Sequence, residues 1–102
     1  MGASQRRKGA DAEREVVNIL REHGINAKRG QVFNNEPDII TDSNIHYEVK
    51  RQEQIRIAEW TKQAEEAAGN CIPVVVYRKS RDDWHVSLRL NDFLELTGNT
   101  LS

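Results

Sequence analysis

Residues 37–50 of this 102-residue chain read Pro37-Asp38-Ile39-Ile40-Thr41-Asp42-Ser43-Asn44-Ile45-His46-Tyr47-Glu48-Val49-Lys50, and this stretch decides the fold. Two short runs of largely β-forming residues flank Asp42-Ser43-Asn44, a group of turn-forming residues. The stretch therefore predicts a β-hairpin whose strands run from Asp38 to Thr41 and from Ile45 to Lys50.

The hairpin brings two acidic residues together. Because side chains alternate between the two faces of a strand, Glu48 and Lys50 share one face. If a three-residue turn pairs Thr41 with Ile45, then Asp38 lies directly opposite Glu48, with their Cβ atoms about 4.5–5.5 Å apart. Two carboxylates this close are unfavourable without a cation between them, and oxygen ligands suit Mg²⁺ or Mn²⁺.

The remaining elements follow from hydrophobic periodicity on either side of the hairpin. The predicted helices are Gly9 to His23, Ile55 to Ala68, and a short last helix that Asn91 caps and Gly98 ends. The other predicted strands are Ile25 to Phe33, Ile72 to Tyr77 and Trp84 to Leu88. This order, αβββαβ followed by a further strand and helix, predicts an α/β fold with a mixed central sheet flanked by helices.

The first predicted helix supplies a third acidic residue. At about 100° per residue, Glu13 falls in the middle of the apolar face, whereas Glu15 falls on the solvent side. A lone buried carboxylate is costly, so Glu13 needs a partner. A metal site on the adjacent sheet is one candidate, and an ion pair with Arg29 or Lys50 is the alternative. We therefore expect Glu13→Gln to reduce activity far more than Glu15→Gln.

The combination resembles a known nuclease signature. Pro37-Asp38, followed after a nine-residue gap by Glu48-Val49-Lys50, resembles the PD-(D/E)XK motif. The segment from Lys8 to Val17, KGADAEREVV, is similar to the first helix of archaeal-type Holliday junction resolvases. The resemblance spans roughly Lys8 to Tyr77, and it implies a restriction-endonuclease-like core that hydrolyses phosphodiester bonds in DNA with a metal ion.

The resemblance also implies a role for each matching residue. Asp38 and Glu48 would bind the metal, with the backbone carbonyl of Val49 as a further ligand. Lys50 would be the catalytic lysine, and Glu13 would support the metal directly or through a bound water. The expected cofactor is Mg²⁺, with Mn²⁺ able to replace it.

Charge is balanced overall but not locally. Fifteen Lys and Arg against sixteen Asp and Glu give a net charge of −1, which by itself does not indicate a nucleic-acid partner. Residues 1–29, however, carry seven basic groups against four acidic ones. We expect residues 1–8 to form a flexible basic arm before a single nuclease domain of residues 9–102. The candidate DNA contacts are Arg6, Arg7, Lys8, Lys28, Arg29, Arg51, Gln63, Arg78 and Lys79.

Several protein classes are excluded by composition. The chain has no apolar run near 18 residues, and its first 15 residues hold no apolar stretch, so neither a membrane span nor a secretory signal is expected. Its single cysteine, Cys71, cannot form an internal disulfide. An intracellular, cytoplasmic location is the expectation.

The leading hypothesis is a Mg²⁺-dependent, structure-selective endonuclease of the Holliday junction resolvase type. The alternatives are another endonuclease of the same fold (nicking, flap or restriction-like) and a non-catalytic DNA-binding module. Glu48-Val49-Lys50 could also be the solvent face of an edge strand, and His46 an ordinary polar residue at a strand end. Because one chain holds one site and a four-way junction needs two cuts, a homodimer is expected. Late apolar residues also favour it: Trp84, Phe93, Leu94, Leu96 and Leu101.

Overall fold

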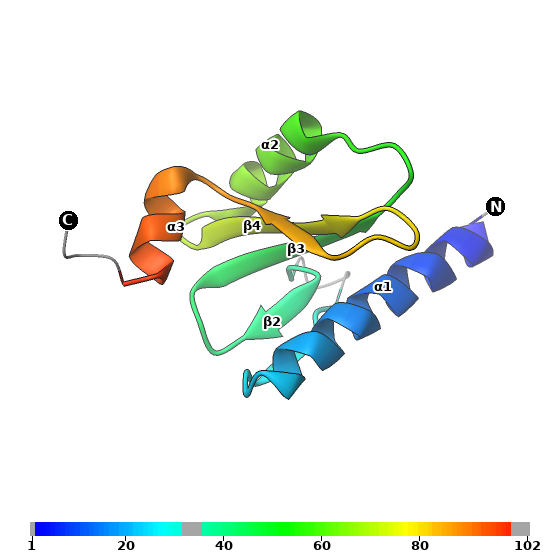
Figure 1. Cartoon of the computed structure of the whole chain (residues 1–102), viewed down its shortest axis with the longest axis horizontal. Helices are drawn as coiled ribbons and strands as arrows, with labels where there is room; N and C mark the ends of the chain where they lie inside the picture. The colour runs from blue at the N-terminus through cyan, green and yellow to red at the C-terminus, as the bar shows by residue number, and fades with distance from the viewer. Residues whose placement is uncertain (1, 32–35, 99–102) are drawn as a thin grey trace.

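In the part of the chain that the structure describes, five strands form one mixed sheet, with a long helix on one face, a second helix on the other and a short third helix at one end (Figure 1). The computed structural model describes residues 2–31 and 36–98, with side chains from Gly9 onward. The helices are α1 (Gly2–Glu22), α2 (Ile57–Ala68) and α3 (Leu90–Leu96). The strands are β1 (Ala27–Arg29), β2 (Ile39–Thr41), β3 (Ile45–Arg51), β4 (Ile72–Arg78) and β5 (His85–Ser87).

The strands lie in the order β1-β2-β3-β4-β5. β3 and β4 are parallel and are joined through α2, while the other neighbouring strands are antiparallel. The expected α/β architecture, a mixed sheet flanked by helices, is confirmed. The pairing of Ile39 with Tyr47 also confirms the three-residue turn and the hairpin register.

α1 begins at Gly2, so the expected helix start at Gly9 is wrong. Residues 2–8, expected to form a flexible arm, continue the helix backbone toward the N-terminus. Ala, Gln, Arg and Lys in this segment are good helix formers, and a glycine inside a helix costs only about 1 kcal/mol relative to alanine. Among the described helices none is both long and apolar enough to cross a membrane.

Several elements are shorter than expected, and one expected helix cap is wrong. β1 covers only part of the stretch from Ile25 to Phe33, whose last two residues lie outside the described ranges. α2 begins at Ile57 rather than Ile55. β5 is likewise shorter than the predicted strand. Arg89, not Asn91, is the N-cap of α3, because the helix begins one residue before Asn91.

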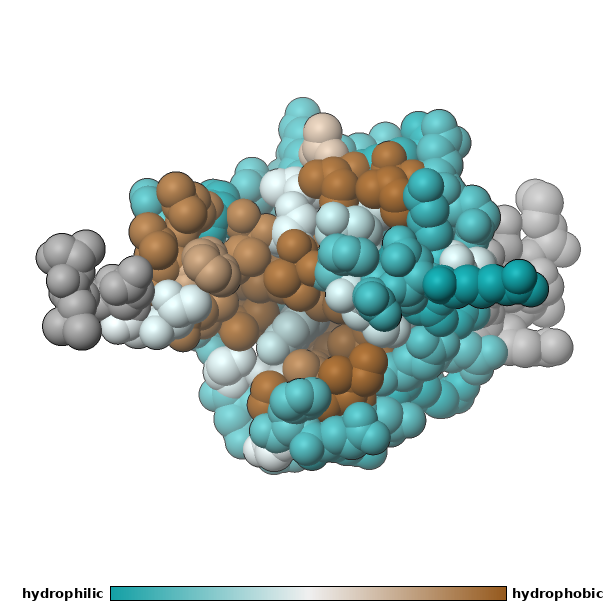
Figure 2. All heavy atoms as spheres, viewed as in Figure 1, coloured by the Kyte–Doolittle hydropathy of each residue, from teal (hydrophilic) through white to brown (hydrophobic). Residues whose placement is uncertain are grey.

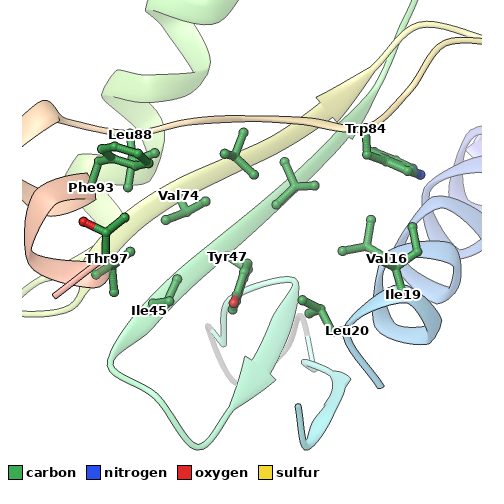
Figure 3. Close-up of a pocket in the computed structure, with 13 residues that line it drawn as sticks. Val16, Ile19, Leu20, Ile45, Tyr47, Val74, Trp84, Leu88, Phe93 and Thr97 are labelled. Carbon is green, nitrogen blue, oxygen red and sulfur yellow. The ribbon is translucent and has the colours of Figure 1, made fainter. Parts of the chain in front are cut away.

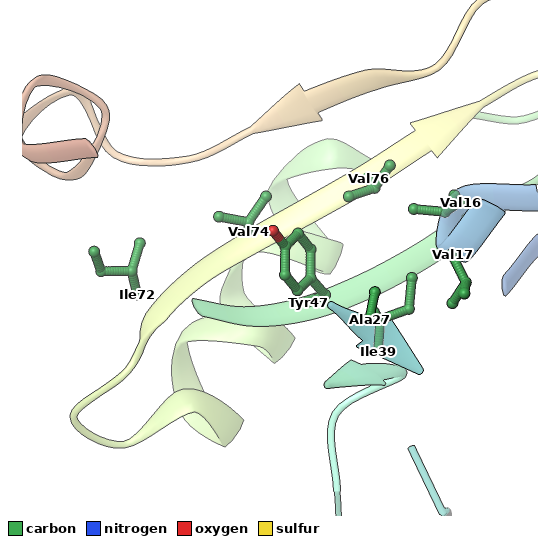
Figure 4. Packing of buried hydrophobic residues seen from close by; sticks show 8 residues of the cluster. All are labelled: Val16, Val17, Ala27, Ile39, Tyr47, Ile72, Val74 and Val76. Carbon is green, nitrogen blue, oxygen red and sulfur yellow. The ribbon is translucent and has the colours of Figure 1, made fainter. Parts of the chain in front are cut away.

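β4 is the most buried strand of the sheet and is covered on both faces, as its nearly continuous apolar sequence predicts. Val74 and Val76 pack in the cluster under α1, together with Tyr47 (Figure 4). Val75 points the other way and packs against Trp60 of α2. Alternation along β3 and β4 therefore assigns each side chain to the α1 face or the α2 face of the sheet.

Candidate active site

Asp38 lies where the chain bends just before β2, and backbone groups hold it from three directions. Its N–H donates to the Tyr47 carbonyl at 3.0 Å, and its carbonyl accepts from the Gly30 N–H at 2.9 Å. Its Oδ2 accepts from the Val49 N–H at 2.8 Å. A β3 amide is thus satisfied by a side chain, which fixes the Asp38 carboxylate at the edge of β3.

Gly30 is required by this arrangement. A Cβ added there would lie 1.8 Å from the carbonyl oxygen of Pro37, a distance that only a backbone shift could relieve. The absence of a side chain lets the end of β1 approach the Pro37-Asp38 backbone closely enough for the Gly30–Asp38 hydrogen bond. Gly30 therefore helps to position Asp38, a role that its place in the sequence does not reveal.

Glu48 lies on the α2 face of the sheet, because it pairs with Val75 of the parallel strand β4. Its side chain is 22% exposed, and its Oε1 is 3.2 Å from Nε2 of His46, whose side chain is almost completely buried. The interpretation of His46 as an ordinary strand-end residue missed this contact. Since residues i and i+2 of a strand share a face, the spacing of the two residues was the available signal.

Glu13 reaches the same region from α1. Its Oε1 accepts a hydrogen bond from Nε of Arg29 at 2.9 Å, so the ion pair considered as an alternative partner is present. Burial raises the pKa of Glu13, and the negative charge of Asp38 raises it further, against the lowering effect of Arg29. Glu13 is therefore a partly buried acid near a second carboxylate.

Asp38 is common to both acidic pairs. Burial also raises the pKa of Glu48, and Asp38 adds to the shift, while His46 and Lys50 oppose it. The structure thus brings Glu13 and Glu48 within electrostatic range of Asp38, and Lys50 within electrostatic range of Glu48. Excess negative charge in a half-buried place favours binding of a cation.

The oxygen atoms near Asp38 fit a hard cation that keeps several waters. The part of the chain that the structure describes contains no group of three or more His, Cys, Asp or Glu side chains arranged to hold a metal. Mg²⁺, however, commonly uses one or two carboxylates together with waters and substrate phosphates. Asp38 and Glu48 meet that requirement. The Val49 N–H points to Asp38, and a strand residue directs its N–H and C=O to the same edge, so the Val49 carbonyl is also on the Asp38 side.

Lys50 lines a polar hollow of about 560 Å³ between α1 and the end of β3. Residues 49–54 form one side of the hollow, and Gly9 and Ala12 of α1 form the other. Of the candidate catalytic residues, Lys50 is the one that lines this hollow within the described part of the chain.

The candidate DNA contacts whose side chains the structure describes fall into two groups. Arg29, Arg51 and Arg78 are held in ion pairs, the first with Glu13 and the other two with Glu15. Lys28, Gln63 and Lys79 are exposed. The side chains of three further candidates lie outside the described part of the chain: Arg6, Arg7 and Lys8.

Sequence reasoning placed Glu15 wrongly on the solvent side of α1. The buried face of the helix is centred on Val16, which is 4% exposed, so Glu13 and Glu15 lie on its two flanks. Glu15→Gln is consequently not an inert control for Glu13→Gln. The sequence held no signal for this contact, because the pairing of Arg51 with Arg78, two adjacent like charges that call for an acidic partner, follows from the register of β3 and β4 in the structure.

Glu15 and its three partners form a group that we call the Glu15 cluster: Glu15, Arg51, Arg78 and Trp84. The carboxylate accepts hydrogen bonds from Nη1 of Arg51 at 2.7 Å, from Nη2 of Arg78 at 2.9 Å and from Nε1 of Trp84 at 3.2 Å. The Arg78 guanidinium also lies 5.0 Å from the centre of the Trp84 ring. Burial by itself would raise the pKa of Glu15, but the hydrogen bonds from Arg78 and Trp84 and the charges of both arginines hold it below its ordinary value.

An apolar groove of about 360 Å³ lies on the α1 face of the sheet, between α1 and α3 (Figure 3). In the space-filling view, hydrophobic residues gather from the α3 end toward the middle of this face (Figure 2). Val86, Phe93 and Leu96 line the groove and are between 43% and 57% exposed. The groove is lined by Val16, Ile19, Leu20, Ile45, Tyr47, Val74, Val76, Trp84, Val86, Leu88, Phe93, Leu96 and Thr97.

Comparison with known proteins gives matches of two kinds, to a family model and to solved structures. The family model described as archaeal Holliday junction resolvase (Hjc) matches residues 4–94. Among solved structures, the chain is similar to Hjc of Archaeoglobus fulgidus, a Holliday junction resolvase from an archaeal hyperthermophile, with a TM-score of 0.58 and 21% identity. That match covers 79% of this chain and 72% of the other. No curated protein sequence matches.

Proposed function

This chain belongs to the archaeal Holliday junction resolvase family, and on that basis we propose a role for each of its charged site residues in the cleavage of a DNA junction. Family membership supports an endonuclease that acts on branched DNA. Asp38 and Glu48 hold a divalent metal ion, Mg²⁺ by preference and Mn²⁺ as a substitute, with the Val49 carbonyl as a further ligand. When bound, the metal lowers the pKa of a coordinated water and neutralises charge on the phosphate.

The chain's own groups supply orientation and charge. Lys50, beside Glu48, orients the attacking water and stabilises the negative charge that develops on the scissile phosphate. Glu13 would support the metal, directly or through a water, and its ion pair with Arg29 keeps the carboxylate near Asp38. Backbone hydrogen bonds to Asp38 hold the centre of the site before substrate arrives.

One observation carries this proposal: Asp38, fixed by backbone groups of Gly30 and β3, carries a charge that acts on both Glu13 and Glu48. A carboxylate with a purely structural role is stabilised by a cation or a hydrogen-bond donor, whereas two acidic neighbours destabilise its charged form. Repulsion between acids that the fold holds together is what a bound cation relieves.

Phosphate contacts outside the site come from basic side chains on α1 and β1. Arg14, Arg21 and Arg29 border a hollow of about 360 Å³ beside Glu13, and Lys28 is exposed on the same strand as Arg29. Contacts of this kind position a DNA backbone without reading its sequence. Such contacts suit an endonuclease that selects branched DNA by its shape.

We also propose that the active unit is a homodimer joined through the apolar groove. Two copies place two sites on a substrate that has two-fold symmetry and needs two cuts. Half-exposed Phe93 and Leu96 at the edge of the groove would be covered by the second copy.

The deciding experiment is a cleavage assay with labelled four-way junction, linear duplex and single strand, each with Mg²⁺, Mn²⁺ or EDTA. Paired symmetrical cuts in the junction, dependent on metal, are expected. Equal cutting of linear duplex would favour another endonuclease of the same fold. Tight junction binding without cleavage at any metal concentration would favour a non-catalytic DNA-binding module.

A further inference from the structure

The Glu15 cluster joins three elements at the end of the sheet that carries Lys50. Glu15 belongs to α1, Arg51 is the last residue of β3, and Arg78 is the last residue of β4. Their side-chain separations are 2.7–2.9 Å, and the two arginine side chains are 18% and 14% exposed. The cluster is therefore a half-buried contact between three elements rather than an isolated ion pair on the surface.

The two arginines need the carboxylate to remain where they are. Arg51 and Arg78 are direct neighbours across the parallel strands, so their charges repel each other. Glu15 accepts a hydrogen bond from each, and Trp84 stacks beneath Arg78. Without the carboxylate the shared acceptor is lost: Arg51 loses its hydrogen bond to Glu15, while Arg78 keeps only its hydrogen bond to the Lys79 carbonyl and its contact with the Trp84 ring.

Arg51 connects this arrangement to the candidate site. It follows Lys50 directly, and it lines the same polar hollow. The backbone N–H of Gln52 donates to the Arg78 carbonyl at 3.2 Å, which ties the next residue of the hollow to β4 as well. The position of the Arg51 side chain therefore shapes the wall of the hollow beside Lys50.

We propose that Glu15 is a positioning residue, which holds Arg51 and Arg78 in one arrangement and thereby shapes the hollow through which the DNA backbone reaches Lys50. This inference rests on the proposed function and deepens it. Glu15 does not touch the reacting atoms. Its ion pairs prevent Arg51 and Arg78 from binding DNA phosphates outside this arrangement, and they hold the wall of the hollow in one conformation.

The test combines Glu15→Gln, Arg51→Gln and the double variant, with Glu22→Gln as a matched control, since Glu22 is an exposed acid of the same helix. Single-turnover cleavage of a four-way junction should fall about tenfold in Glu15→Gln at protein concentrations that saturate the junction. The double variant should be no slower than the slower single variant, because the two residues act as one unit. Glu22→Gln should match the parent protein.

Two further measurements need no cleavage. The Trp84 fluorescence, isolated by comparison with Trp84→Phe, should shift to the red in Glu15→Ala, because this variant leaves the indole N–H without its carboxylate acceptor. Junction affinity should depend more steeply on salt concentration in Glu15→Gln, with a log–log slope larger by about one, because a released arginine can pair with a phosphate.

The outcomes separate the two proposals. Parent-like cleavage by Glu15→Gln, or rate losses that multiply in the double variant, would overturn the positioning role. An unchanged Trp84 spectrum together with an unchanged salt slope would overturn it as well. If the parent protein itself fails to cut any junction, the proposed function fails, and the fluorescence and salt measurements still decide the role of Glu15.

Discussion

Asp38 and Glu48 are the side chains whose charge the proposed chemistry needs most directly. Asp38→Asn and Glu48→Gln remove a negative charge but keep side-chain volume and an acceptor oxygen for Val49 and His46 respectively. Cleavage should fall by at least about 100-fold, since a metal contributes several kcal/mol of transition-state stabilisation. Junction binding in EDTA and the far-ultraviolet circular dichroism spectrum should be unchanged. Full activity in either variant would remove the metal-site assignment.

The raised pKa of Glu48 makes a second residue-scale prediction, this time for the metal-free protein. Burial and the charge of Asp38 raise the pKa above the ordinary value of 4.5. The folded state therefore holds the proton more tightly than the unfolded state, so the contribution of Glu48 to stability is present below about pH 4.5 and is lost as pH rises through the raised value.

Glu48→Gln, which cannot ionise, should accordingly increase the free energy of unfolding in EDTA at pH 7. The gain should disappear at pH 4, where the parent carboxyl is protonated. Urea unfolding at both pH values measures this, with Glu66→Gln on the exposed side of α2 as the control. A destabilised Glu48→Gln protein at pH 7 would mean that the carboxylate stabilises the fold rather than straining it.

At the scale of elements, the pairing of β1 with β2 places Asp38 at the edge of β3. This placement is most sensitive to substitution of Gly30. Gly30→Ala forces a Cβ against the Pro37 carbonyl, so the backbone before Asp38 must move. We expect a loss of stability of about 1–3 kcal/mol, typical of overpacking, and a drop in cleavage larger than unfolding explains.

Gly9→Ala is the natural comparison for Gly30→Ala, because Gly9 lies inside α1 with no atom near its missing Cβ. That substitution should stabilise the protein by about 0.5–1 kcal/mol through higher helix propensity. Thermal unfolding of both variants tests the contrast. If Gly30→Ala were as stable and active as the parent protein, the close approach of Gly30 to Pro37 would not matter for the site.

At the scale of the whole molecule, the apolar groove predicts association. Sedimentation at micromolar concentration should give about twice the 11.7 kDa mass of one chain. Leu96→Asp, which places a charge at the edge of the groove, should yield monomers and lose paired cutting of a junction. Leu90→Asp is the control, since Leu90 is 69% exposed on the same helix but does not line the groove. A monomeric parent protein that binds a junction as a single copy would favour a nicking enzyme instead.

Local patterns were sufficient for much of the fold and for part of the candidate site. The turn formers and the two-residue period of the hairpin predicted the register that pairs Ile39 with Tyr47, and with it the neighbourhood of Asp38 and Glu48. The apolar sequence of β4 predicted a strand buried on both faces. These features depend on residues close in the chain, whose relative directions are set by strand geometry alone.

Tertiary structure alone decided which charges meet. Glu15 finds Arg51 and Arg78, which are 36 and 63 residues away in the chain, and Gly30 must pass close to Pro37. A helical wheel shows that Glu13 and Glu15 lie on different sides of α1, but the helix can be rotated on the sheet without changing its periodicity. The rotation is set by how α1 packs across β3, which centres Val16 on the core and turns both acids toward partners on different strands. The sequence by itself thus determined the elements, the hairpin register and the acidic pair, whereas the packing of α1 on the sheet decided the partners of each acid on the helix.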